Sequence, residues 1–257
     1  MSMGQANQSG WVSQELAEDR HWWFASRTRA LFSMMDGLVS GGDNRILDVG
    51  CGAGNMFHHL SRFGSVVGIE NNPKPLAVAR ERGYDVRLGR AEEMPFPNES
   101  FDLIAALDVI EHCEDDQRVL QECYRVCRPG GLIVITTPAF QWLWSRNDEI
   151  NHHYRRYSGR ELNAKLNEAG FRVRRLAYNN FFVFPLAAAL ILVRRKGGDE
   201  PKLAAPDTDE EAYQVEMEPA SPPVNAALTV VGSLEAALLK WVNLPVGTGI
   251  ICIAERT

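Results

Sequence analysis

The residues best suited to chemistry follow an apolar run at residues 101–107. The stretch LDVIEHCED (107–115) brings Asp108, Glu111 and His112 within about one helical turn of each other. Imidazole titrates near neutral pH, so His112 could act as a general base on a substrate hydroxyl, with Asp108 beside it. The carboxylates and the imidazole could instead bind a divalent ion, or the acids could simply stabilise a helix start. All three interpretations stay open at this point.

A second reactive cluster is NHHYRRYS (151–158), which holds two histidines, two arginines and two tyrosines. It follows an apolar run at 132–138, so we expect it at the same edge of a sheet as His112. His153 would face inward as a base or a metal ligand. Arg155 and Arg156 would bind an anionic group, pair with acids or stay in solvent, where single charges contribute little.

A glycine-rich turn supplies a candidate cofactor site. ILDVGCGAGN places Gly50, Gly52 and Gly54 directly after an apolar run, where backbone without Cβ atoms can approach a ligand. The free N–H groups of a following helix favour an anionic ligand. Glu70 ends the next apolar run, about 20 residues on, where a carboxylate can accept hydrogen bonds from ribose hydroxyls. The dinucleotide fingerprint needs a glycine where Asn55 stands, which disfavours an NAD-dependent oxidoreductase.

The elements that must position these residues alternate along the chain. Helix-end signals include Asn72, Gly83 and the S-x-x-E pair Ser158 and Glu161, and RPGG (128–131) predicts a turn. This alternation predicts an α/β fold with a Rossmann-like, mostly parallel sheet and helices on both faces. Strands are predicted at 45–50, 65–70, 84–89, 101–107, 132–138 and 171–178, and helices at 13–40, 55–63, 72–83, 115–127 and 158–170.

Several motifs together resemble the class I S-adenosylmethionine (SAM)-dependent methyltransferases, in the subgroup that methylates small molecules. They cover residues 45–178, and they are D-x-G-x-G-x-G (48–54), GIE (68–70), RAEEMPFPNESFDLI (90–104) and RPGGLIVITTP (128–138). The resemblance implies SAM as the cofactor and a seven-stranded sheet. It also implies that the final strand, in 249–257, is antiparallel.

The same resemblance implies roles for individual residues. The turn would face the methionine part of SAM with Asp48 nearby, and Asp108 would lie near the sulfonium. Relatives often have an acid where Arg90 stands, which puts the adenine contact in doubt. Glu70 would take the ribose hydroxyls, and Asn71, Ala91 and Glu92 would flank the adenine. The full cofactor set is Asp48, Gly50, Cys51, Gly52, Gly54, Glu70, Asn71, Ala91, Glu92, Asp108 and Arg27.

The resemblance also bears on the candidate metal site. The D-x-x-E-H spacing at 108–112 is similar to the E-x-x-E-H of metal-dependent O-methyltransferases that modify quinone precursors and small-RNA ends. It implies Asp108, Glu111, His112 and His153 as ligands of a divalent ion. The alternative keeps His112 and His153, with Asp108, as catalytic residues without a metal.

HWWFASR (21–27) belongs to a predicted N-terminal helical cap over residues 1–44. Three adjacent aromatic residues cannot all face one side of a helix, so we expect two to be buried and one exposed. Alternatively this helix closes over the cofactor and excludes water. Arg27 would then reach the carboxylate of SAM, with Arg29 as the other candidate.

A helical insertion is predicted at 179–248, before the last strand. FFVFPLAAALILV (181–193) is too short to span a bilayer as a helix, and 226–244 is also apolar. Between them, 197–225 contains five prolines and eight acids against one lysine, which predicts a flexible linker. The two apolar segments would pack on each other and the sheet edge, form a dimer contact, hold a lipid-like acceptor or lie in a membrane interface.

Composition and charge bound the remaining choices. Residues 151–196 carry ten Lys/Arg and two Asp/Glu, although the chain has a net charge of −6 and a pI of about 5.6. That pI and the lack of an RNA-binding module disfavour nucleic acid as the acceptor. Five cysteines without a CxxC pair and an N-terminus without a signal pattern favour a reducing cytoplasm.

We therefore predict a SAM-dependent methyltransferase that acts on an oxygen of a small or lipid-linked acceptor. A SAM-binding protein without catalysis and an NAD-dependent oxidoreductase are the alternatives.

Overall fold

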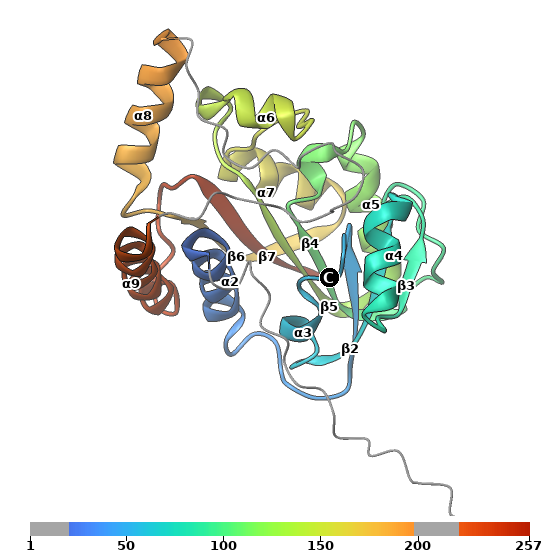
Figure 1. Ribbon diagram of the computed structural model, residues 1–257. Coiled ribbons are helices and arrows are strands. Elements are labelled where there is room, and N and C mark those ends of the chain that lie inside the picture. The colour runs from blue at the N-terminus through green and yellow to red at the C-terminus, as the bar shows by residue number, and fades with distance from the viewer. Residues whose placement is uncertain (1–20, 198–220) are drawn as a thin grey trace, which may run out of the picture.

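The computed structural model describes residues 21–197 and 221–257 of the chain (Figure 1). A seven-stranded sheet with the order β3-β2-β1-β4-β5-β7-β6 forms its centre. Neighbouring strands run parallel except β7, which is antiparallel to β5 and β6, so the predicted fold class is confirmed. The strands are β1 (Asn44–Val49), β2 (Gly64–Glu70), β3 (Val86–Leu88), β4 (Phe101–Leu107), β5 (Cys127–Pro138), β6 (Phe171–Asn179) and β7 (Gly249–Arg256).

Helices cover both faces of this sheet, because its central strands are apolar on both sides. In β1, Leu47 and Val49 pack in the layer that includes residues of α5 and α7, whereas Ile46 packs in the layer of α2. The helices are α2 (Trp22–Met35), α3 (Phe57–Leu60), α4 (Pro73–Glu81), α5 (Asp116–Val126), α6 (Arg146–Ile150), α7 (Gly159–Glu168), α8 (Phe184–Gly197) and α9 (Pro222–Leu239), with short 3-10 helices η1 (Ile110–His112) and η2 (Gln141–Leu143).

The predicted helix-end signals act as expected. The Asn72 side chain accepts a hydrogen bond from the Lys74 N–H (3.0 Å), which starts α4. Ser158 and Glu161 form a reciprocal capping box at the start of α7. These local interactions fix where α4 and α7 begin, at the edge of the sheet that carries the candidate site.

Some predicted boundaries were wrong. RPGG lies inside β5 as a bulge, because the pairing with β4 jumps from Phe101–Cys127 to Leu103–Leu132. The helix expected at 55–63 is a single turn, Phe57–Leu60, because residues 52–56 continue the glycine turn. Of the helix expected at 13–40, the structure describes Trp22–Met35, and residues before 21 lie outside the described residues.

The aromatic prediction for α2 was also wrong. Trp22, Trp23 and Phe24 are each half-buried, rather than two buried and one exposed. The C-terminal half of α2 belongs to the core of the sheet, where Leu31, Met34 and Met35 are almost fully buried.

Helix α9 packs along α2 rather than along α8, which disfavours one of the alternatives, that the two apolar segments pack on each other (Figure 1). A Cβ at Gly232 would lie 2.0 Å from the Ser26 hydroxyl oxygen, so this glycine permits the close approach of the two helices. α9 begins at Pro222, inside the segment predicted as a linker, and residues 198–220 of that segment lie outside the described residues.

Candidate active site

The glycine turn follows β1 at the carboxyl edge of the sheet, as predicted. Gly50, Gly52 and Gly54 all have positive φ values (64°, 53° and 79°), which favour glycine. A Cβ at Gly50 would lie 2.8 Å from Val109, and one at Gly54 would lie 2.5 Å from the Tyr84 ring. Among the described residues, a Cβ at Gly52 would meet nothing within 4 Å, so this glycine borders space that a ligand can fill.

Two carboxyl groups lie beside this turn. Asp48 is almost fully buried, and its Oδ2 atom has no hydrogen-bond partner among the residues that the structure describes. Burial and the nearby charge of Glu70 raise the pKa of Asp48 to about 8. A buried carboxyl oxygen without a partner calls for a donor, and the ammonium group of a bound amino acid moiety meets that need.

Glu70 already has two donors. Its carboxylate accepts hydrogen bonds from the backbone N–H of Gly52 (2.9 Å) and of Asn72 (2.8 Å). Each carboxylate oxygen can accept a second bond, so a contact with ribose hydroxyls stays a prediction. The Cys51 thiol is buried against Gly68, which leaves only the backbone of Cys51 for a cofactor.

The residues predicted to flank the adenine lie after β2 and β3. Asn71 is exposed, whereas Ala91 and Glu92 are half-buried. Arg90, which stands where relatives often have an acid, pairs with Glu92 at 3.3 Å. Their contact with adenine stays a prediction.

Asp108 and Arg27, both predicted to face the cofactor, form an ion pair with each other. Asp108 follows β4 with a φ of 56°, and its other carboxylate oxygen accepts a hydrogen bond from the Thr136 hydroxyl (2.8 Å). This pair holds α2 over the carboxyl edge of the sheet. In the part of the chain that the structure describes, Arg29 instead has two buried guanidinium nitrogens without partners.

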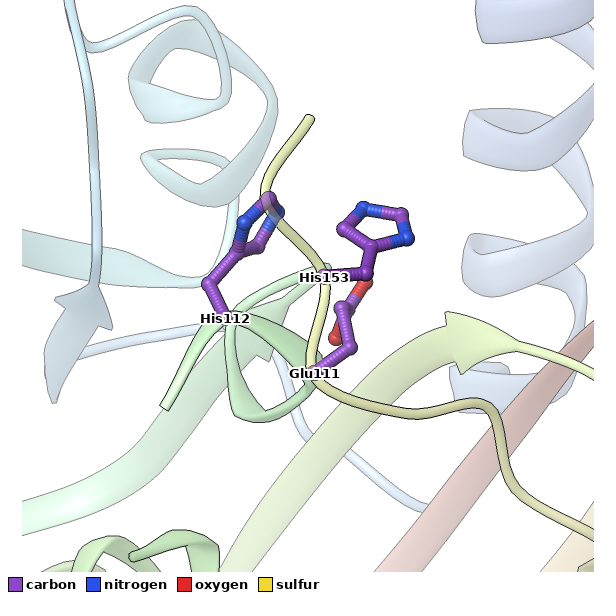
Figure 2. A group of neighbouring side chains, drawn as sticks. All are labelled: Glu111, His112 and His153. Atoms are coloured by element: carbon purple, nitrogen blue, oxygen red, sulfur yellow. The ribbon is translucent and has the colours of Figure 1, made fainter. Parts of the chain in front are cut away.

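Glu111, His112 and His153 come together, as predicted, although His153 is about 40 residues further along the chain. Figure 2 shows Glu111 and His112 on η1 and His153 on the loop before α7. One ligand atom from each residue lies within 4.8 Å of the others, and the two imidazole rings are 4.5 Å apart. Asp108 is not part of this group, which corrects its assignment as a fourth metal ligand.

The protonation of this group follows from its surroundings. Glu111 is fully buried, and burial raises its pKa to about 8 even though its Oε2 accepts a hydrogen bond from the Thr137 hydroxyl (3.2 Å). Its Oε1 has no partner among the described residues. His112 is exposed on one side, but crowding by protein and the neighbouring His153 lower its pKa to about 4. Glu111 and His112 are therefore both neutral at pH 7.

Asp148 is a site residue that the sequence did not predict. It is fully buried, and His153 Nδ1 lies 2.8 Å from its Oδ1. Arg156 donates to both of its oxygens, at 2.7 Å and 2.8 Å. Burial alone would raise the pKa of Asp148, but the hydrogen bonds from His153 and Arg156 outweigh it and lower the pKa to about 2. The only local signal for Asp148 was its place three residues after Ser145, where the two residues form a capping box at the start of α6.

Both arginines of NHHYRRYS pair with acids, which was one of the three expectations. Arg156 pairs with Asp148, and Arg155 lies 3.0 Å from Asp116. Asp116 also accepts a hydrogen bond from the Tyr157 hydroxyl (2.6 Å). Tyr157 also donates to the Ile110 carbonyl (3.3 Å), and together these contacts fix the loop that carries His153 against η1 and α5.

Comparison with known proteins agrees with this geometry. The sequence profile of the family described as "Methyltransferase domain" matches residues 47–135. A probable S-adenosylmethionine-dependent methyltransferase of Mycolicibacterium smegmatis is 31% identical over 190 residues, which cover 71% of this chain and 70% of that protein. A ubiquinone biosynthesis O-methyltransferase of Pseudomonas entomophila is 38% identical over 114 residues, or 40% of this chain and 48% of that protein.

Solved structures share the fold at low sequence identity. An S-adenosylmethionine-dependent methyltransferase from Mesorhizobium loti has a TM-score of 0.55 and 17% identity, with 93% of this chain and 98% of that chain covered. The cyclase SpnF has a TM-score of 0.58 and 21% identity, with 91% and 82% covered. The glycine turn, the acids beside it and the similarity across most of the chain lead to one conclusion: this protein belongs to the class I SAM-dependent methyltransferases.

Proposed function

We propose that the enzyme transfers the methyl group of SAM to an oxygen of a small or lipid-linked acceptor, and that His153 is the base. The observation that carries this proposal is the contact of His153 Nδ1 with the buried, ionised Asp148. With its proton on Nδ1, the ring keeps a free electron pair on Nε2. That nitrogen can accept the proton of an acceptor hydroxyl.

The other site residues would bind and orient SAM. Asp48 would accept the ammonium of SAM, the open side of Gly52 would admit its methionine part, and Glu70 would accept the ribose hydroxyls. When bound, SAM supplies the methyl group on its sulfonium. The Arg27–Asp108 ion pair holds α2 over this edge, where the helix would exclude water once SAM is bound. Alignment of acceptor and donor, together with proton removal, accounts for catalysis in this proposal.

A divalent ion is the second candidate for activation of the acceptor. The observation that favours it is the buried oxygen of Glu111 that has no partner in residues 21–197 and 221–257 and lies beside two imidazoles (Figure 2). One carboxylate oxygen and two imidazole nitrogens are a donor set suited to first-row transition metals. Glu111, His112 and His153 would hold the ion, which would lower the pKa of a bound hydroxyl.

The choice of oxygen draws on the relatives named as ubiquinone biosynthesis O-methyltransferases, of which this chain spans about half the length. Because His112 and Glu111 are both neutral, neither side chain places a negative charge beside a phenol or alcohol acceptor. Localisation in the cytoplasm belongs to the same proposal.

An assay with tritiated SAM over cell-extract fractions, with and without chelator, tests this function. A matched pair of variants is His153→Asn and His152→Asn, because His152 is exposed and has a positive φ that asparagine tolerates. We expect label in a small-molecule or lipid fraction, loss of transfer in His153→Asn and retention in His152→Asn. Activity that chelator removes and zinc, manganese or magnesium restores would favour the metal, whereas S-adenosylhomocysteine binding without any transfer would favour a non-catalytic protein.

A further inference from the structure

Helices α8 and α9 present an apolar surface that the rest of the described protein leaves uncovered. Its exposed members include Leu186, Leu190 and Val193 on α8 and Val230, Leu234 and Leu238 on α9. The only charged residue of α9 is Glu235, and it is buried, so the outer face of this helix carries no charge. A helix on the surface of a soluble protein normally has charged residues on its outer face.

α9 is held along the protein. Among the described residues it is the one helix long and apolar enough to cross a membrane. However, Gly232 lies against Ser26 of α2, and Glu235 accepts hydrogen bonds from the backbone N–H of Asn180 (2.5 Å) and Phe182 (3.4 Å). Crossing a bilayer would break these contacts. α9 therefore keeps one face on α2 and turns the other outward.

The Glu235 contacts also tie the start of α8 to the middle of α9, because Asn180 and Phe182 directly precede α8. Figure 1 shows both helices on the same side of the molecule, with α8 projecting beyond the rest of the fold. Two apolar helices on one side of the molecule, one of them projecting, form a surface that can insert into a lipid layer.

The residues at the ends of this surface indicate what covers it. Trp241, just after α9, is 86% exposed, and tryptophan favours the boundary between apolar and polar layers. Lys240 lies beside it and forms an exposed ion pair with Asp36 (3.1 Å), and the sequence RRK (194–196) follows the apolar part of α8. Cations that border an apolar surface match anionic headgroups above acyl chains. A second copy of the chain would instead bring the same cations to one interface.

We propose that α8 and α9 bind the surface of an anionic phospholipid membrane, with Leu186, Leu190, Leu234, Leu238 and Trp241 in the interface. This inference does not depend on methyl transfer. It places the active-site edge close to a bilayer, where a lipid-linked acceptor would be available.

Flotation of the full chain with vesicles tests the proposal. Vesicles of phosphatidylcholine with phosphatidylglycerol are compared with vesicles of phosphatidylcholine alone. The variants are Leu234→Asp with Leu238→Asp, and Leu186→Asp with Leu190→Asp. The control is Leu88→Asp, because Leu88 is 57% exposed, comparable with Leu234 at 60%, but lies on β3 at the edge of the sheet opposite β6.

We expect the wild type and the control to float with anionic vesicles, and each double variant to lose at least about tenfold in its partition coefficient. Binding to neutral vesicles should be weaker, and salt should reduce the difference. Protein that stays in the soluble phase would overturn the proposal, as would a dimer in ultracentrifugation that the α9 variant dissociates. Calorimetry with S-adenosylhomocysteine on the same samples tests the proposed function separately, because the double variants should keep that binding.

Discussion

His153 Nδ1 lies 2.8 Å from Oδ1 of Asp148, a carboxylate that is fully buried and has both oxygens bonded to Arg156. The arginine neutralises the acid, so Asp148 orients the imidazole without adding a free negative charge to the site. Asp148 is thus a positioning residue that acts through His153, in the way that a carboxylate behind a histidine fixes its tautomer.

Asp148→Asn should lower kcat by about 10- to 100-fold, because the amide can turn its N–H₂ toward the ring and favour the wrong tautomer. The affinity for S-adenosylhomocysteine should stay unchanged, since the side-chain partners of Asp148 are His153, Arg156 and Ser145 and include no residue of the proposed cofactor site. The pH profile of kcat is the decisive measurement. A lower melting temperature with an unaltered pH profile and kcat would show that Asp148 has only a structural role.

Gly52→Ala should weaken binding of S-adenosylhomocysteine by at least about tenfold, because its methyl group would occupy the open space that the ligand needs. Gly37→Ala is a matched control. Gly37 has a φ of 75°, similar to the 53° of Gly52, and its Cβ would also meet nothing within 4 Å. Both variants should lose about 1 kcal/mol of stability from backbone strain. Calorimetry in which both bind equally well would exclude a ligand at Gly52.

The sequence predicted those parts of the fold and site that depend on local interactions. Ser158 and Glu161 cap α7 within one turn. Gly50, Gly52 and Gly54 have positive φ values, a requirement that each residue meets without any distant partner. The packing of α9 on α2 joins residues such as Trp22 and Asn225, 203 positions apart, and no local pattern encodes it. Asp148 escaped prediction for another reason: its partners His153 and Arg156 lie in an irregular loop, where no helix or strand period indicates which side chains meet.

Arg175→Met should destabilise the protein by about 1.5 to 3 kcal/mol. Its guanidinium donates hydrogen bonds to the carbonyls of Leu239 (2.6 Å) and Met34 (3.4 Å), at the carboxyl ends of α9 and α2. Cations at these positions also interact favourably with both helix dipoles. Arg174→Met is the neighbouring control, because Arg174 is exposed and pairs with Glu255 at the surface, which contributes about 0.5 kcal/mol. Equal losses in urea unfolding would contradict the capping role of Arg175.

The raised pKa of Asp48 makes stability depend on pH in a defined direction. In the folded protein Asp48 keeps its proton up to a pKa of about 8, whereas the unfolded chain releases it near the ordinary value of 3.8. Unfolding between these pH values therefore releases a proton, so the free energy of unfolding falls as pH rises from about 4 to 8. Glu111, with a pKa raised to about 8, contributes in the same direction.

Asp48→Asn should therefore stabilise the protein without ligand, by an amount that grows with pH and reaches about 1 to 3 kcal/mol at pH 8. The amide keeps the shape of the side chain but has no charge to bury. The same change should weaken S-adenosylhomocysteine binding by at least about tenfold, because the amide gives its ammonium a weaker acceptor than a carboxylate. Urea unfolding at pH 5, 6, 7 and 8, with and without S-adenosylhomocysteine, measures both effects. A wild type whose stability does not fall over this range, or an Asp48→Asn variant that binds the ligand normally, would show that the carboxyl group is not held ready for the cofactor.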